Sequence, residues 1–172
     1  MDYNSLHKLS AMLPVYGPEG GNQTKLYCFD GTTEMLPLRQ ETVINRFASV
    51  FGINLSAQRK NTEGQINIGK YHPLWFSLDV VLFPLYTRVP HNSRDGASGY
   101  FSLTAIEGVI SLERPRGERS QPGTAVYLKG GHRIEVYCGY STVSRRMNNA
   151  QAYQQTQNTL VAGNKWESVI YR

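Results

Sequence analysis

Cationic side chains in polar stretches of sequence are the groups in this chain best suited to chemistry or binding. Four such groups can be recognised, three in predicted loops and one on a predicted late helix. They comprise Arg59, Lys60, Arg88, Arg94, Arg114, Arg116, Arg119, Arg145 and Arg146. Lysine and arginine neutralise phosphates and release counterions, which provides affinity for nucleic acid without base choice. The pattern therefore predicts a polyanion-binding surface, provided that the loops converge at one end of a sheet.

The positive charge is unevenly distributed along the chain. The formal net charge is +5 over 172 residues. Between Met1 and Val50 acidic residues outnumber basic ones, whereas between Phe101 and Ala150 basic residues outnumber acidic ones. A basic half of a globular protein favours a polyanionic partner, above all nucleic acid. The alternative interpretation of each basic segment is a solvated surface without a ligand.

The histidines and acidic residues give little support for enzyme chemistry. Neither His7 nor His132 has a partner at a zinc-binding spacing, and the same holds for His72 and His91. P-loop and GxSxG motifs are absent from the sequence. We therefore predict a non-enzymatic protein with no catalytic residue, cofactor or metal. A nuclease that uses His72, His91 or Asp79 is the alternative enzymatic hypothesis.

Targeting signals and cysteine usage predict a cytoplasmic, nucleoid-associated protein. No apolar run approaches the roughly 20 residues that span a bilayer, and the first residues lack the basic and apolar regions of a signal peptide. Cys28 and Cys138 form no CxxC arrangement. In a reducing compartment both are expected to be small buried apolar residues.

The stretch from Ile68 to Ile110 is expected to position the central basic loop. Two apolar runs, Leu74–Phe76 and Val80–Phe83, are typical of buried strands. Pro84 should end the second strand or lie at a sheet edge. A polar loop from Arg88 to Ser98 follows, before the strand pattern resumes. Long loops in a compact domain are commonly functional or disordered, so a strand pair would present a basic loop to a ligand.

Two helices are predicted, one early and one late. Apolar spacing from Arg39 to Phe51 indicates an amphipathic helix, with Gly52 as its terminating glycine. A second helix is expected from Ser141 to about Leu160, followed by a short strand from Ser168 to Tyr171.

Turn residues and alternation predict the remaining elements. Asp30-Gly31 and Gly130-Gly131 are typical of hairpin turns. A polar loop is expected from Ala57 to Glu63 and a short strand from Gln65 to Ile68.

Short strands joined by hairpins, with one helix near each end, predict the fold class and domain organisation. We expect an α+β fold with mainly antiparallel sheets. Residues 1–22 are predicted to form a loosely ordered arm, with at most a short edge strand from Met12 to Tyr16. Residues 23–172 are predicted to form a single DNA-binding domain.

The segment NRFASVFGINLSAQRKNTEGQINIGKYHPLWFSLDVVLFPLYTRVPHNSRDGASGYFSLTAI is the sequence of residues 45–106. This segment resembles the core of ComK-type competence transcription factors of Gram-positive bacteria. The resemblance extends from about Thr24 to Leu160. The shared features are a helix ending in Phe51-Gly52, the Arg59-Lys60 segment, His72-Pro73, Leu82-Phe83-Pro84, and the aromatic strand at Tyr100-Phe101.

This resemblance implies a transcription activator of DNA-uptake genes. Such a factor would bind AT-rich promoter boxes of double-stranded DNA as a dimer or higher oligomer, largely through the minor groove. RNA polymerase and a regulatory adaptor or protease would be its further partners, with no membrane involved.

A second stretch, from Ile106 to Asn149, is similar to LytTR-type DNA-binding domains, which implies the major groove instead. The likeness lies in a strand, a YLKGG hairpin, an IEV strand and a helix carrying arginine. A protein-interaction module with an acidic partner is the alternative without DNA.

Overall fold

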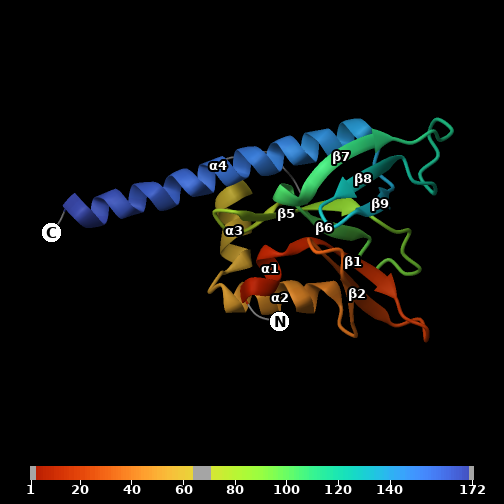
Figure 1. Ribbon diagram of the computed structural model, residues 1–172, viewed down its shortest axis with the longest axis horizontal. Helices are drawn as coiled ribbons and strands as arrows, with labels where there is room; N and C mark the ends of the chain where they lie inside the picture. The colour runs from red at the N-terminus through yellow and green to blue at the C-terminus, as the bar shows by residue number, and fades with distance from the viewer. Residues whose placement is uncertain (1–2, 64–70, 171–172) are drawn as a thin grey trace.

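Antiparallel sheets and helices make up the computed structural model, which describes residues 3–63 and 71–170 (Figure 1). The predicted α+β fold is confirmed. The larger sheet has the strand order β3-β2-β1-β6-β5-β4 and the smaller one the order β7-β8-β9. The strands of the larger sheet are β1 (Leu9–Tyr16), β2 (Asn22–Cys28), β3 (Thr33–Leu36), β4 (Leu74–Ser77), β5 (Val80–Tyr86) and β6 (Ser98–Ser102). Those of the smaller sheet are β7 (Ile106–Ser111), β8 (Thr124–Leu128) and β9 (His132–Val136). The α-helices are α1 (Tyr3–His7), α2 (Gln40–Val50), α3 (Leu55–Glu63) and α4 (Tyr140–Ile170), and a 3-10 turn spans Leu103–Ala105.

The larger sheet is the middle layer of the fold, with apolar side chains buried on both of its faces. On β5, Val81 and Phe83 pack with the smaller sheet and α4, whereas Val80 and Leu82 pack with α1 and α2. Figure 1 shows α4 running across one side of the molecule and α2 lying on the other. Burial on both faces explains why β5 is a continuous apolar run in the sequence rather than an alternating one.

The prediction of a loosely ordered arm over residues 1–22 is wrong for β1. This strand pairs with β2 on one side and with β6 on the other, so it lies inside the larger sheet. Ala11 and Met12 are fully buried, each in a different core. Gly17, Gly20 and Gly21 lie in the turn between β1 and β2, where Gly17 N donates to Gly21 O.

Pro84 does not end β5, which continues to Tyr86. The strand tolerates the proline because β4 pairs only as far as Leu82 of β5, so Pro84 lies where this side of the strand has no β4 partner. The Pro84 carbonyl instead accepts from Arg146 Nη1 at 2.9 Å. In a strand the N and O of one residue point to the same side, so the missing N–H of Pro84 leaves the β6 ladder intact. The prediction of a strand end is therefore wrong. β5 is not an edge strand either, but Pro84 lies in a part of it that β4 leaves unpaired.

The early helix is confirmed, and its terminating Gly52 has a left-handed φ of 66°. The predicted loop from Ala57 to Glu63 is instead part of α3. The Asn54 side chain accepts from Ala57 N at 3.0 Å and so caps the first turn of this helix. A segment of polar residues without glycine or proline, predicted to be a loop, is therefore a helix.

The late helix is longer than predicted and extends past the body of the molecule in Figure 1. The Gln/Asn-rich middle of α4 is held against the turn between β4 and β5, because the side-chain amides Gln154 Nε2 and Asn158 Nδ2 both donate to the Leu78 carbonyl in that turn. The strand expected from Ser168 onward is helical through Ile170. The strand expected over residues 65–68 lies outside the described residues. Within the described part of the chain, no helix has the length and apolar character needed to cross a membrane.

Both predicted hairpins form, and their turns pack against each other. His132 Nε2 lies 2.8 Å from Cys28 O, and Ser10 Oγ donates to Lys129 O at 2.8 Å. A Cβ at Gly130 would collide with Cys28 O and would lie 2.9 Å from Gly31 N. Gly130 therefore serves two needs, a positive φ of 92° and a close approach between the two sheets.

We expect Gly130→Ala to lower the free energy of unfolding by about 3 kcal/mol, because a left-handed backbone and a steric clash both oppose the methyl group. Gly131→Ala is the matched control, since Gly131 has a φ of 73° but no neighbouring atom within 4 Å of the place that a Cβ would occupy. It should cost only about 1 kcal/mol. Urea unfolding followed by circular dichroism measures both, and equal losses would contradict the close packing of the two turns.

Candidate functional site

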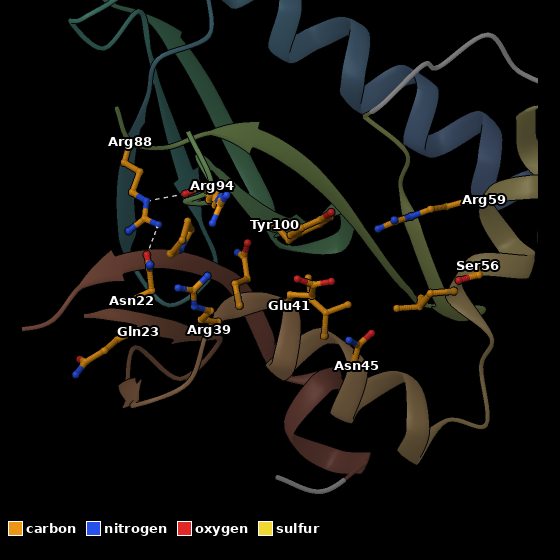
Figure 2. A pocket seen from close by; sticks show the side chains of 15 residues that line it. Asn22, Gln23, Arg39, Glu41, Asn45, Ser56, Arg59, Arg88, Arg94 and Tyr100 are labelled. Carbon is orange, nitrogen blue, oxygen red and sulfur yellow. Dashed lines mark hydrogen bonds between the residues drawn. The ribbon is translucent and has the colours of Figure 1, made fainter. Parts of the chain in front are cut away.

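An open cleft of about 470 Å³ lies between the start of α2, the start of α3 and the loop joining β5 to β6. Four arginines line it, with Glu41 as the one carboxylate in the lining (Figure 2). Its lining is Pro14, Asn22, Gln23, Arg39, Gln40, Glu41, Ile44, Asn45, Leu55, Ser56, Arg59, Arg88, Arg94, Gly96 and Tyr100. The fold thus brings together Arg59, Arg88 and Arg94 from the predicted set.

Arg39 also lines the cleft, although it was not among the residues predicted from the sequence. It occupies the N-cap position of α2, with φ −63° and ψ 144°. The segment around it is anchored to the sheet, because Thr24 Oγ1 donates to Leu38 O at 2.8 Å and Gln40 Nε2 donates to Met12 O at 2.9 Å. The sequence did contain a signal for this role, because Arg39 begins the stretch predicted to be an amphipathic helix and so lies at a helix start.

Arg59 is positioned by its neighbour Gln58. The Gln58 side chain donates to Trp75 O at 2.6 Å and accepts from Trp75 N at 3.3 Å. It therefore pairs with the backbone of the edge strand β4 as another strand would, which covers the edge. This contact holds α3 on the sheet and leaves the exposed Arg59 beside the cleft (Figure 2).

Two helix N-termini add to the positive potential of the cleft. Gln40 and Glu41 of α2 line it, as do Leu55 and Ser56 of α3. The first amides of a helix lack intrahelical partners, and the helix dipole places partial positive charge there. Together with the guanidinium groups, these ends make the cleft suited to an anion.

Tyr100 lies in the cleft between the two sides and faces Arg59 in Figure 2. Burial raises the pKa of the Tyr100 hydroxyl, and the Arg59 guanidinium opposes that rise. The hydroxyl therefore stays protonated at neutral pH and can donate a hydrogen bond to an anion in the cleft.

Arg88 anchors the basic loop to the rest of the sheet. Its Nε donates to Gly96 O at 2.7 Å, closing the loop, and its Nη2 donates to Asn22 Oδ1 at 2.6 Å. The guanidinium carbon also lies 4.1 Å from the centre of the Tyr16 ring. Burial lowers the pKa of Arg88, with the nearby Tyr16 and Asp95 opposing that shift. Arg88 thus shapes one wall of the cleft and has few donors left for a ligand.

The loop is further held by Asp95, His91 and Tyr16. Asp95 accepts from Tyr16 Oη and from Asn22 Nδ2, each at 2.7 Å. The His91 ring stacks on the Tyr16 ring at 4.0 Å, and His91 N donates to Tyr16 Oη at 2.8 Å. These contacts order a loop that the sequence left as functional or disordered, and they present Arg94 to the cleft.

None of the four cleft arginines forms an ion pair with a described carboxylate. The ion pair found among the described residues joins Arg133 to Glu135, at 2.7 Å, on the smaller sheet. The positive charge of the cleft is therefore available to an external anion.

The loop between β7 and β8, the basic tip, carries Arg114, Arg116 and Arg119 of the predicted set, and these three arginines have different roles. Arg114 is half-buried, and its Nη1 donates to Gln121 O at 3.1 Å and to Tyr137 O at 3.0 Å. It closes its own loop, whereas Arg116 and Arg119 are exposed.

The two arginines predicted on the late helix, α4, also differ in their exposure. Arg145 is exposed, but Arg146 is only 8 % exposed. The Arg146 guanidinium binds Pro84 O and stacks on the Tyr71 ring at 3.7 Å, so it lies in the interior rather than on the predicted contact surface. Lys60, on α3, is exposed but does not line the cleft.

The residues of the nuclease hypothesis do not gather at one site. Asp79 precedes β5 and His91 follows it, so the seven residues of this strand, roughly 20 Å, separate them. His72 is buried beside the start of β4. Across residues 3–63 and 71–170, no three His, Cys, Asp or Glu side chains gather closely enough to hold a metal ion.

Comparison with known proteins gives no match for this chain, either to a protein-family model or to a curated protein sequence.

Tyr16→Phe should raise the pKa of Asp95 toward its ordinary value, because the Tyr16 hydroxyl is the largest cause of the lowered pKa. Loop stabilisation from this contact is present above the ordinary carboxyl pKa and is lost as the pH falls through the lowered one. NMR titration of the side-chain carboxyl measures the change. Asp30, whose pKa is lowered by Thr32, is the internal control and should not move. An unchanged Asp95 pKa would contradict the contact.

Proposed function

We propose that this chain binds double-stranded DNA and regulates transcription, with the arginine-lined cleft contacting backbone phosphates. The convergence of Arg39, Arg59 and Arg94 in one cleft, whose wall Arg88 shapes, without an ion pair to a described carboxylate, carries this proposal. Phosphate contacts come typically from arginine side chains and helix N-termini, and they set the position of a protein on the duplex.

Consecutive residues of the chain join the cleft to a second basic surface. Arg88 lines the cleft, and the next two residues, Val89 and Pro90, border a pocket that also includes Arg119. A duplex seated on the cleft would therefore run beside the loop that carries Arg116 and Arg119. Contacts from both surfaces would neutralise several phosphates along one face of the DNA.

The ComK resemblance supports a finer proposal, an activator of DNA-uptake genes that binds AT-rich promoter boxes as a dimer. Arg94 and Arg116 are exposed side chains on loops, as expected for arginines that enter a narrow A-tract minor groove. The LytTR likeness favours the major groove and would use the start of α4, where Arg145 is exposed.

Affinity for duplex DNA should fall steeply with salt. For about four phosphate contacts, the affinity should drop roughly 100-fold between 50 and 200 mM salt. Fluorescence anisotropy with AT-rich and GC-rich duplexes of equal length measures the slope and the base preference. Failure to bind either duplex, together with binding of an acidic protein, would favour an interaction module and overturn the proposal.

Arg94→Ala should weaken binding to all duplexes and make the salt dependence shallower by about one phosphate contact. Arg46→Ala is the matched control, because Arg46 is an exposed arginine on α2 that does not line the cleft. It removes the same charge and should change the affinity less than twofold. Equal losses in the two variants would indicate a general charge effect and contradict the role of the cleft.

A further inference from the structure

A second pocket, of about 610 Å³, is joined to the arginine-lined cleft by the chain itself, because Arg88 lines the cleft and the next two residues, Val89 and Pro90, line the pocket. It is bordered by the end of β5, the loop after it, the basic tip between β7 and β8, and the segment after β9. Its lining includes Tyr71, Tyr86, Val89, Pro90, Arg119 and Tyr137. Ligand sites in proteins commonly have about this volume and a similar aromatic lining with few polar groups.

The tyrosines of this pocket are held in place by contacts that leave the Tyr86 ring accessible. Tyr86 uses its backbone to join the sheets, because its N donates to Cys138 Sγ and its O accepts from Tyr137 N at 2.7 Å. Its side chain is 36 % exposed. Arg146 supports the Tyr71 ring at 3.7 Å. A rigid aromatic surface of this kind loses little entropy when a flat ligand stacks on it.

The charge around the pocket favours an anionic ligand. Arg119 is the one charged residue in the lining. The adjacent Glu118 carboxylate keeps its negative charge but does not line the pocket, and it accepts from Ser120 N at 2.8 Å and from Ser120 Oγ at 2.5 Å. The buried Arg146, behind Tyr71, has no ion pair with a described carboxylate. A flat group attached to a phosphate matches both the aromatic lining and this potential.

We infer that the pocket binds an unpaired nucleobase, by stacking on its tyrosines, while Arg119 contacts the attached phosphate. This inference rests on the proposed nucleic-acid function and extends it to single strands. Stacking on aromatic side chains is the usual means of holding unpaired bases, and it tolerates any sequence. We expect the cleft to contact neighbouring phosphates of the same strand, because Arg88 of the cleft and Val89 and Pro90 of the pocket are consecutive in the chain.

The test uses a short single-stranded oligonucleotide that contains one 2-aminopurine, titrated with the full chain. Stacking in the pocket should quench the fluorescence of this base. Tyr86→Ala should abolish the quenching and weaken binding about tenfold, since base stacking on aromatic side chains typically has an effect of this size or larger. Tyr86→Phe keeps the ring and should stay within twofold of the unmodified protein.

Tyr140→Ala is the matched control, because Tyr140 is a 50 % exposed tyrosine outside this pocket. It should leave quenching and affinity unchanged. Thermal unfolding of each variant establishes that the chain is folded, which is expected for Tyr86→Ala because Tyr86 joins the two sheets through its backbone atoms. Quenching that survives in Tyr86→Ala, or equal losses in the two alanine variants, would overturn the inference.

Duplex binding, measured in parallel, separates this inference from the proposed function. Tyr86→Ala should retain its affinity for duplex DNA, whereas Arg94→Ala should lose it. If no duplex binds but Tyr86→Ala still abolishes single-strand quenching, the base pocket stands and the duplex proposal falls. If a proline-rich peptide binds through Tyr86 and the oligonucleotide does not, the pocket recognises protein and the inference fails.

Discussion

The hydrogen bonds along the free edge of β5 are the constraint on which the rest of the structure depends. β4 pairs only as far as Leu82, so the backbone beyond it must find other partners. Arg146 Nη1 donates to the Pro84 carbonyl. Tyr86 O accepts from Tyr137 N, and Tyr86 N donates to Cys138 Sγ. These few bonds attach α4 and the smaller sheet to the larger one. They also hold the starting point of the basic loop, which leaves β5 two residues later.

The arginines divide into two classes according to what lies within their reach. Arg114 and Arg146 bind carbonyls that no strand or helix partner uses, and both become part of the framework. Arg59 and Arg94 have no described carboxylate partner and line an open cleft. A guanidinium has five donors, so it serves equally well as a backbone clamp or as a phosphate contact. Unsatisfied carbonyls nearby, rather than residue type, decide which role each arginine takes.

The cleft and the tyrosine pocket share one short segment of chain, and this continuity relates the two proposals. The cleft is polar and cationic, with two helix N-termini, whereas the pocket is aromatic with a single arginine. Phosphates suit the first environment and bases suit the second. A strand of nucleic acid placed across both would have its backbone and an unpaired base in separate, chemically matched sites.

Local signals in the sequence were sufficient for the hairpins, for α2 and for the α+β class, because turn glycines and apolar periodicity act over a few residues. They also placed Arg59, Arg88 and Arg94 within a predicted set of nine cationic residues, but only the fold brought these three into one cleft. Tertiary structure alone decided the interior position of β1, since that depends on pairing with β6, about 90 residues away in sequence. It also placed Arg39 in the cleft. Arg146 is buried because it binds the Pro84 carbonyl, which is 62 residues away in sequence and has no local signature near Arg146.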